Sequence, residues 1–185
     1  MTDRSRLITL LANRSTKRGR FTLASGKTSE VYIDARLTTM SPDGLRLIGS
    51  LGLAAINAES WDADSVGGLT LGADPIAYAI SYASAASSTP LRAFTVRKQA
   101  KTHGTGQLIE GPFVPRDRVV IVEDVVTTGG SALQAIDAVR KADGVIAGVL
   151  ALVDREEGGC EVIEAVGVRV VSLVRASELL EALPT

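Results

Sequence analysis

Short apolar runs alternate with helix-like segments through most of this 185-residue sequence. Helical patterns open at Ser41 and Pro42 and at Asp74 and Pro75, and a third one, SALQAIDAVRKADG, is closed by Gly144. The strand-like runs are DSVGGL, LRAFTVR, RVVIVED, VIAGVLALVD and VRVVSLV. Strands that are apolar on both faces and alternate with helices predict an α/β fold with a mostly parallel central sheet flanked by helices.

The first 40 residues follow a different pattern. Residues 3–16 are expected to form a helix, and FTLASGKTSEVYIDAR is typical of two extended segments around a turn at residues 25–27. A helix from 42 to about 58 follows, with apolar residues at helical spacing. We therefore expect residues 1–40 to form a hood of one helix and a hairpin. It belongs to a single domain over residues 1–185, because no break in composition argues for two.

Composition and charge exclude several classes of protein. Hydrophobic residues make up 45% of the chain and charged residues 22%, which is typical of a folded globular domain. The net charge of -1 gives no reason to expect a nucleic-acid partner. We find no signal peptide and no apolar run of membrane length, so we expect no membrane partner either. Cys160 is the only cysteine and His103 the only histidine, which excludes intrachain disulfides and Cys/His zinc sites and favours the cytoplasm. A lone thiol is usually inert, so Cys160 is assigned no role.

Ligands of such sheets bind beyond the carboxyl ends of the strands, and there the segment VVIVEDVVTTGGS, residues 119–131, combines two useful groups. Backbone N–H groups of its Gly-rich turn can converge on a phosphate at the start of a helix. Glu123 and Asp124 would repel that phosphate, but they can accept hydrogen bonds from sugar hydroxyls or hold Mg²⁺. Together these groups indicate a ribose 5-phosphate site. The alternative is a strand that ends in solvated acids, with Thr128 or Ser131 capping the helix.

Three better-known motifs do not fit this segment. A Walker loop would need a Gly-Lys-Ser/Thr ending, and a dinucleotide fold would need three spaced glycines. A receiver domain that began at residue 119 would have too little chain left to complete its fold.

A second segment, RKQAKTHG, follows the strand LRAFTVR and lies within residues 75–109, which contain no Asp or Glu. Glycines at 104 and 106 favour a mobile, positively charged loop over residues 97–108, able to close on a multiply anionic group. A solvated basic loop is the alternative. An RNA-binding patch is disfavoured, because no aromatic residues are interleaved with the cations.

Two weaker segments complete the set. GGLTLGADP can offer backbone amides to an anion, and Asp74 is expected to cap the next helix. In LVDREEGG, Arg155 stands just past a buried strand and can bind a planar carboxylate, although a salt bridge to a nearby Glu is the alternative.

In this order the segments resemble the phosphoribosyltransferases of type I, and VVIVEDVVTTGGS resembles their thirteen-residue signature for phosphoribosyl pyrophosphate. RKQAKTHG is similar to the mobile catalytic loop of the orotate-specific members, and FTLASGKTSEVYIDAR and LVDREEGG are similar to their orotate-binding segments. The resemblance covers residues 20 to 160, approximately. It implies a type I phosphoribosyltransferase-like fold and a Mg²⁺-dependent transfer in de novo pyrimidine biosynthesis, from phosphoribosyl pyrophosphate to orotate, giving orotidine 5'-phosphate and pyrophosphate.

The resemblance also implies roles for individual residues. Glu123 and Asp124 would bind the ribose hydroxyls, with Asp124 also counted as catalytic, and Mg²⁺ would be held mainly through substrate and near these two acids. The 5'-phosphate would lie on the backbone of Val125, Val126, Thr127, Thr128, Gly129, Gly130 and Ser131. Four catalytic residues would neutralise the leaving pyrophosphate: Arg97, Lys98, Lys101 and His103. Orotate would be held by Tyr32, Ile33, Thr127 and Arg155.

The resemblance further implies a homodimer in which the loop reaches the partner's site, so that Lys98 acts in trans. The sequence departs from the family in two places, since some members have a lysine where this chain has Ala24 and another within the turn LTLGAD. Lys27 or backbone amides would then replace those contacts. Two other functions remain open: transfer to another base, such as a purine or uracil, and non-catalytic sensing of phosphoribosyl pyrophosphate by a regulator.

Overall fold

The computed structural model describes residues 1–22, 28–99 and 108–183, and its centre is a six-stranded sheet in the order β5-β4-β3-β6-β7-β8. All neighbouring strands are parallel except β4 and β5. The strands are β3 (Ser65–Leu69), β4 (Arg92–Val96), β5 (Ile109–Glu110), β6 (Arg118–Val126), β7 (Val145–Asp154) and β8 (Val170–Arg175). The expected α/β fold with a mostly parallel sheet is confirmed.

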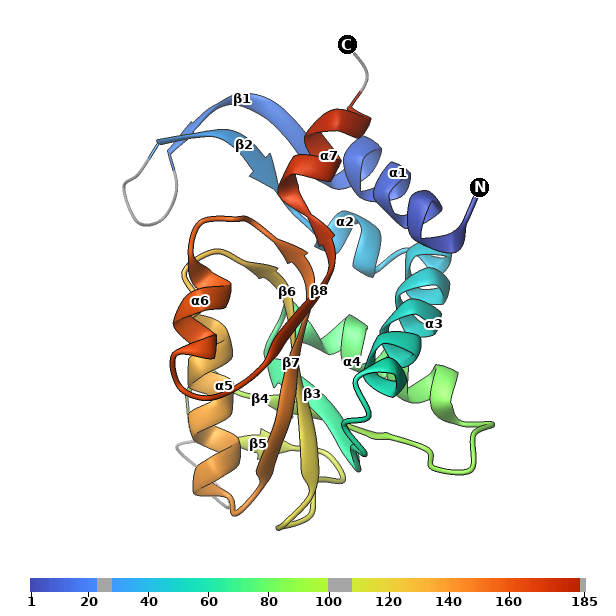
Figure 1. Ribbon diagram of the computed structural model, residues 1–185, viewed down its shortest axis with the longest axis vertical. Coiled ribbons are helices and arrows are strands. Elements are labelled where there is room, and N and C mark those ends of the chain that lie inside the picture. The colour runs from blue at the N-terminus through green and yellow to red at the C-terminus, as the bar shows by residue number, and fades with distance from the viewer. Residues whose placement is uncertain (23–27, 100–107, 184–185) are drawn as a thin grey trace.

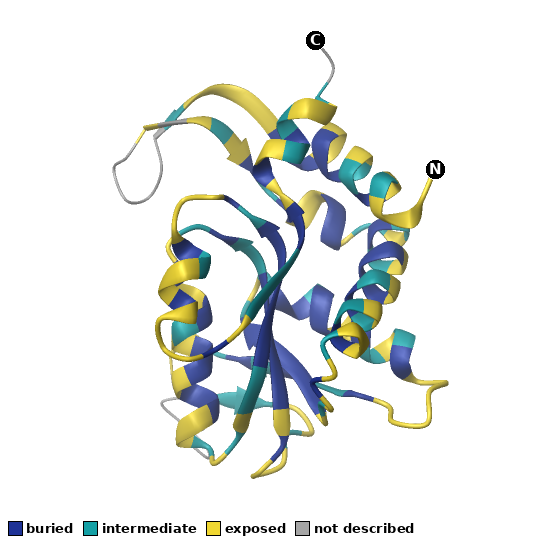
Figure 2. Ribbon diagram, in the orientation of Figure 1, coloured by how far each residue is buried: buried dark blue, intermediate teal, exposed yellow. Residues whose placement is uncertain are grey.

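Helices cover both faces of this sheet (Figure 1). One face carries α3 (Pro42–Ala58) and α4 (Ala73–Ser84), and the other carries α5 (Gly130–Lys141) and α6 (Gly159–Glu164). Strand β6 supplies both apolar layers by alternation: Val120 and Val122 pack on the α3 side, and Val119 and Ile121 pack on the α5 side. The strands therefore lie buried between two layers of amphipathic helices, as Figure 2 shows.

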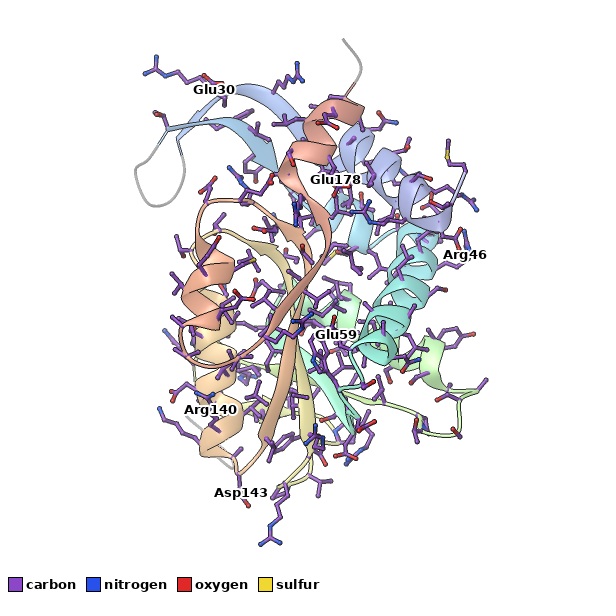
Figure 3. The ribbon with its side chains drawn as sticks, viewed as in Figure 1. Glu30, Arg46, Glu59, Arg140, Asp143 and Glu178 are labelled. Carbon is purple, nitrogen blue, oxygen red and sulfur yellow. The ribbon has the colours of Figure 1, made fainter. Side chains whose placement is uncertain are left out.

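The segment 1–40 contains α1 (Asp3–Ser15), the antiparallel strands β1 (Thr16–Thr22) and β2 (Thr28–Ile33), and α2 (Arg36–Thr39). Helix α1 buries Leu7 and Leu11 completely, and it packs beside α3 and the C-terminal helix α7 (Ala176–Ala182). Arg4 donates to Glu178 of α7 at 2.7 Å, where Figure 3 labels the acid. Both ends of the chain thus build the hood.

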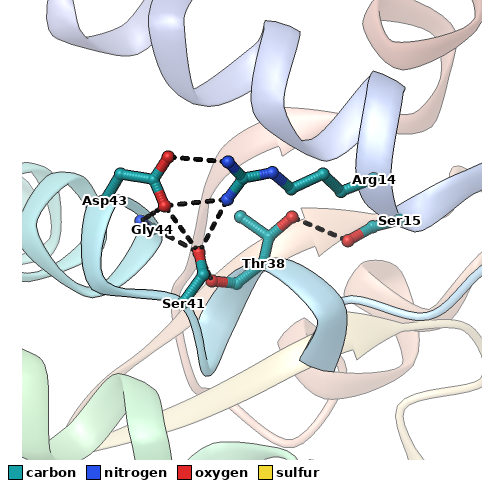
Figure 4. Close-up of polar contacts among 6 residues, drawn as sticks. All are labelled: Arg14, Ser15, Thr38, Ser41, Asp43 and Gly44. Carbon is teal, nitrogen blue, oxygen red and sulfur yellow. Dashed lines mark hydrogen bonds and ion pairs between the residues drawn. The ribbon is translucent and has the colours of Figure 1, made fainter.

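A polar cluster fastens the hood to α3 (Figure 4). The guanidinium of Arg14 donates to both carboxylate oxygens of Asp43, at 2.7 and 2.9 Å, and this contact holds the pKa of Asp43 well below its usual range. Ser41 accepts from the backbone N–H of Gly44 at 3.2 Å, with Pro42 at the first helical position, so the predicted start of this helix is confirmed.

Several short elements were not predicted, namely α2, β5, α6 and α7. Each has between two and seven residues, which is too short for a helical or strand period to be recognised. No helix in the described ranges is long and apolar enough to cross a membrane.

Residues 75–109 contain no acid, but cations of this stretch can still pair with acids that lie elsewhere in the sequence. Arg92 donates to Asp117 at 2.6 Å, and Asp117 is only 5% exposed. This carboxylate lies just before β6, at the amino end of the sheet. A cation of the acid-free stretch therefore finds its partner 25 positions away.

Candidate active site

A cleft of about 280 Å³ lies between the hood and the carboxyl ends of β3, β4 and β6. We call it the hood cleft. Three segments and Lys98 form its walls: residues 32–36 of the hood, residues 69–72 after β3, and residues 123–125 of β6 together with Ser131. The predicted site residues that line it are Tyr32, Ile33, Lys98, Glu123, Asp124, Val125 and Ser131.

The acid pair lies within β6 and not beyond it. We expected the strand to end at the acids, but the β-branched residues Val125 and Val126 continue the pairing with β7 as far as Asp154. Glu123 is consequently 7% exposed, and its Oε2 accepts no hydrogen bond within the described chain. Burial, followed by the neighbouring charge of Asp124, raises the pKa of Glu123 to about 8. A buried carboxyl oxygen with no partner is costly, so this oxygen is available to accept a hydrogen bond from a ligand.

The Gly-rich turn behind the acids leaves a helix start open. A hollow of about 30 Å³ is lined by Glu123 and by residues 125–132. Gly129 caps α5 with φ +79°, and a Cβ there would come within 2.7 Å of the Gly159 carbonyl, so the turn requires glycine. Among the described residues no side chain caps α5, so the alternative of a cap by Thr128 or Ser131 is wrong. The first N–H groups of α5 therefore point at a hollow that suits a phosphate.

The turn after β3 forms the opposite wall. Its peptide bond between Thr70 and Leu71 is cis. Gly72 packs so closely on the carboxylate of Asp124 that a Cβ would come within 2.5 Å of it. The prediction that Asp74 caps α4 is wrong, because Gly72 occupies the N-cap and Asp74 lies inside the first turn. The Asp74 carboxylate instead accepts hydrogen bonds from hydroxyl groups.

The basic segment is described only at its two ends. Lys98 is exposed and lines the hood cleft, and its carbonyl accepts a hydrogen bond from Gln134 of α5 at 3.1 Å. Arg97 forms an ion pair with Glu110 at 3.6 Å, and its backbone N–H donates to the Leu108 carbonyl. Lys101 and His103 lie outside the described residues, as does most of the predicted loop 97–108.

The predicted orotate-binding residues are divided between two places. Tyr32 and Ile33 line the hood cleft, whereas Thr127 lines the phosphate hollow. The Arg155 side chain is 6% exposed; it donates to Glu157 at 2.7 Å and to the Val31 carbonyl of the hood at 3.4 Å. The salt bridge considered as an alternative for Arg155 is therefore present, and the same guanidinium contacts the hood strand next to Tyr32.

One charged pair of the cleft was not predicted. Arg36 donates to both oxygens of Asp34, at 2.8 and 3.0 Å, and this contact lowers the pKa of Asp34. Asp34 raises the pKa of Arg36, with a smaller contribution from Asp124, so this cation lies within the field of the acid pair. Both residues belong to the motif FTLASGKTSEVYIDAR, but nothing in their spacing shows that α2 brings Arg36 into the cleft.

Two other expectations concern positions outside the cleft. Ala24 and Lys27 lie outside the described residues, so the replacement for the missing lysine there stays a prediction. Cys160 is half-buried in α6, and burial raises the pKa of its thiol to about 12, which keeps it neutral and unreactive at pH 7. Within the described part of the chain, no group of three or more His, Cys, Asp or Glu side chains could hold a metal.

Comparisons with known proteins agree on one family. Orotate phosphoribosyltransferase of Aquifex aeolicus (strain VF5) is 46% identical over 183 residues, covering 97% of this chain and 99% of the relative. The enzyme of the same name from Mycobacterium tuberculosis (strain ATCC 25618 / H37Rv) is 45% identical over 177 residues, with 96% of each chain covered. No model of a protein family matches the sequence.

Solved structures give the same result. The Mycobacterium tuberculosis H37Rv orotate phosphoribosyltransferase in complex with 5-phospho-alpha-D-ribosyl 1-diphosphate superposes with a TM-score of 0.81, at 42% identity, over 96% of this chain and 99% of that one. Its complex with Fe(III) dicitrate gives a TM-score of 0.85 at 44% identity, with the same coverage. Adenine phosphoribosyltransferase of Leishmania donovani, at 18% identity and a TM-score of 0.66, shares the fold alone.

Proposed function

The chain belongs to the orotate phosphoribosyltransferase family, and we propose that its reaction takes place in the hood cleft. The enzyme transfers the ribose 5-phosphate of phosphoribosyl pyrophosphate to orotate, giving orotidine 5'-phosphate and pyrophosphate. The observation that best supports the proposed site is the Oε2 of buried Glu123 beside the start of α5, because neither group has a side-chain partner among the described residues. An acceptor for a sugar hydroxyl next to a cradle for a phosphate fits a ribose 5-phosphate.

In this proposal Glu123 and Asp124 bind the two ribose hydroxyls. The 5'-phosphate occupies the hollow behind them and accepts hydrogen bonds from backbone N–H groups of residues 127–131, because the N–H of Val125 donates to Asp124 Oδ1 at 2.9 Å. Because Glu123 and Asp124 would face the sugar and the helix start would face the phosphate, the negative charge of Asp124 is kept apart from that of the phosphate. The reacting C1' of the ribose then faces the part of the cleft between Lys98 and the hood.

Cleavage of the glycosidic bond builds positive charge on the ribose ring and negative charge on the leaving pyrophosphate. Cations fixed beside the leaving group stabilise that transition state, and they do so more strongly when water is excluded. We assign this task to Arg97, Lys98, Lys101 and His103. Lys98 supports the assignment by its place in the cleft lining, whereas Arg97 would have to leave Glu110 to reach the substrate.

Orotate is proposed to lie against the backbone of Tyr32 and Ile33, with Thr127 and Arg155 completing its site. Arg155 is proposed to bind the orotate carboxylate, which would compete with Glu157 for the guanidinium. We expect Arg155→Ala to raise the KM for orotate by about tenfold or more, since a charge-assisted contact is lost. Unchanged orotate kinetics would refute this assignment and favour a base without a carboxylate.

Magnesium fits the site as an ion carried by the substrate. Asp124 and, once ionised, Glu123 would offer oxygen ligands of the kind that Mg²⁺ prefers, but two carboxylates do not complete its shell. The phosphate oxygens and ribose hydroxyls of phosphoribosyl pyrophosphate would supply the rest. When bound, Mg²⁺ would neutralise charge on the pyrophosphate as it leaves.

The family leads us to expect a homodimer in which Lys98 acts in the partner's site. The alternative is that Lys98 acts in the site of its own chain, because it lines the hood cleft there. Mixing Lys98→Ala with Arg155→Ala protein separates the two arrangements. With Lys98 in trans, random exchange restores about a quarter of the sites, because one site of each mixed dimer has both groups intact. With Lys98 in cis, exchange restores none.

The proposed function is tested by adding phosphoribosyl pyrophosphate and Mg²⁺ to orotate and the protein and following the loss of orotate absorbance. Turnover that depends on all components supports it. Binding of phosphoribosyl pyrophosphate without turnover would favour a sensing regulator, and turnover only with a purine or uracil would favour another base. A cytoplasmic location is part of the same proposal, in keeping with a soluble biosynthetic enzyme.

A further inference from the structure

The carboxylate of Asp74 is surrounded by hydroxyl groups. It is 9% exposed, and it accepts from Thr70 at 2.7 Å through Oδ2 and from Thr95 at 2.8 Å through Oδ1. Tyr78, one turn further along α4, shares a hydrogen bond of 3.0 Å with the hydroxyl of Thr95. No cation pairs with Asp74 in the part of the chain that the structure describes, so its negative charge is stabilised by these hydroxyls and by the start of α4.

The direction of each hydrogen bond follows from the donors available. A carboxylate only accepts, so the single hydroxyl protons of Thr70 and Thr95 both point to Asp74. The proton of Thr95 is thereby used, and Tyr78 must donate to Thr95. The network is fully directed toward Asp74, and replacing the carboxylate disturbs every member of it.

These contacts join the two walls that flank the acid pair. Thr70 belongs to the turn 70–72 in the lining of the hood cleft, and Gly72 of this turn packs against the Asp124 carboxylate. Thr95 belongs to β4, three residues before Lys98, which lies in the same lining. Asp74 itself does not line the cleft. One buried carboxylate therefore fixes the turn after β3 relative to the strand that delivers Lys98.

We propose that Asp74 is a positioning residue for phosphoribosyl pyrophosphate, acting through Thr70 and Thr95 to hold the turn 70–72 against Asp124 and in line with Lys98. The inference rests on the proposed function, because it assigns the walls of the cleft to that substrate. Its distinctive consequence is selectivity. Loss of the network weakens binding of phosphoribosyl pyrophosphate, whereas the hood segment that is proposed to hold orotate is not connected to Asp74.

The test compares Thr95→Val, which removes one hydroxyl at constant shape, with Thr95→Ser, which keeps it, and adds Asp74→Asn. A matched control is Asp117→Asn, since Asp117 is also a buried carboxylate that accepts two hydrogen bonds, but at the far end of the sheet. The dissociation constant of phosphoribosyl pyrophosphate with Mg²⁺ is measured by calorimetry, KM values by orotate absorbance, and stability by thermal unfolding.

We expect Asp74→Asn and Thr95→Val to weaken binding of phosphoribosyl pyrophosphate by about tenfold, because hydrogen bonds to a buried charge are lost, with the KM for orotate within about twofold of wild type. Thr95→Ser should restore wild-type binding, and Asp117→Asn should lower only the unfolding temperature. The inference is overturned if Thr95→Val binds like wild type, or if its loss matches that of Asp117→Asn. Absence of turnover by the wild-type protein would refute the proposed function, while calorimetry would still decide the role of Asp74.

Discussion

Two strand-to-helix turns meet in the hood cleft, and they use their acids in opposite ways. Both turns follow a buried parallel strand, and both helices start at a glycine with no side-chain cap, Gly72 or Gly129. In the β3 turn, the buried Asp74 has both oxygens occupied by hydroxyls of the protein. At the end of β6, just before its turn, the buried Glu123 keeps one oxygen without a partner in the described chain.

This difference indicates two roles: Asp74 holds the wall of the cleft in place, whereas Glu123 is available to bind a ligand. A buried carboxylate whose hydrogen bonds are all made within the protein stabilises the fold and has no oxygen left for a substrate. A buried carboxyl with an open oxygen lowers stability in the free protein and gains a partner when a hydroxyl binds. The two turns are therefore expected to respond differently to substitution, to pH and to substrate.

The largest effect is expected for Asp124→Asn. The change removes a negative charge beside the ribose, where positive charge develops, at nearly constant volume. We expect kcat/KM for phosphoribosyl pyrophosphate to fall by about 100-fold, measured by orotate absorbance. Asp117→Asn is the control for loss of a carboxylate elsewhere. A variant that keeps about a fifth or more of wild-type activity would remove Asp124 from the catalytic group.

Gly72→Ala tests the point at which the two turns touch. The added Cβ would come within 2.5 Å of the Asp124 carboxylate, so that carboxylate must move. We expect a loss of about tenfold in kcat/KM, because a displaced catalytic group is poorly aligned. The double variant Gly72→Ala with Asp124→Asn should lose little beyond Asp124→Asn alone. Fully multiplicative losses would show that Gly72 acts independently of Asp124.

The pH dependence of stability sharpens the contrast between the two acids. The pKa of Glu123 is raised from its ordinary value to about 8, so the folded protein retains a proton that the unfolded chain has lost. The stabilisation of the fold by this proton is complete below the unfolded pKa and disappears as the pH rises through 8. The side chain of the Glu123→Gln variant cannot ionise, so the variant does not lose this stabilisation. Its free energy of unfolding minus that of wild type should therefore increase by on the order of 3 kcal/mol between pH 5 and pH 8.

Urea unfolding of both proteins at several pH values measures this difference, and a difference that is constant with pH would contradict it. Asp117→Asn serves again as the control, since it should show no comparable gain toward pH 8. Glu123→Gln keeps the shape of the Glu123 side chain, so this variant is expected to fold.

The smallest effect is expected at the entrance of the basic segment. Gln134 donates to the Lys98 carbonyl from an exposed position on α5, and an exposed neutral hydrogen bond is weak. Gln134→Glu removes the donor, and we expect kcat/KM to fall by about threefold. Asp137→Asn, one turn along the same surface of α5, should be neutral in this assay. Equal activities of the two variants would mean that α5 does not fix Lys98.

The sequence predicted the sheet and the long helices well, because these depend on local patterns. Apolar strands that alternate with amphipathic helices fix the fold class, and Ser41 followed by Pro42 marks the start of α3 at the correct residue. The acids, threonines and glycines of residues 123–131 run from the end of β6 into the start of α5, as their order predicted, whereas the binding of a ribose phosphate there stays a prediction.

Features that depend on distant contacts could not be predicted. Asp74 has the sequence context of a helix cap, but it lies in the first turn of α4, where its carboxylate accepts a hydrogen bond from Thr95, 21 positions away. Arg36 reaches the cleft because the short helix α2 turns the chain there, and α2 has too few residues for a visible period. Burial of Glu123, and hence its raised pKa, follows from the continuation of β6 as far as Val126.

The central claim is that the acid pair Glu123 and Asp124 and the start of α5 together bind the ribose 5-phosphate. A crystal structure of the protein with phosphoribosyl pyrophosphate and Mg²⁺ tests it most directly. The account predicts ribose hydroxyls within hydrogen-bonding distance of Glu123 and Asp124, with the 5'-phosphate on the backbone N–H groups of residues 127–131. A substrate bound elsewhere, such as in the hollow that Arg18 and Arg20 line between the hood strands and α7, would contradict it.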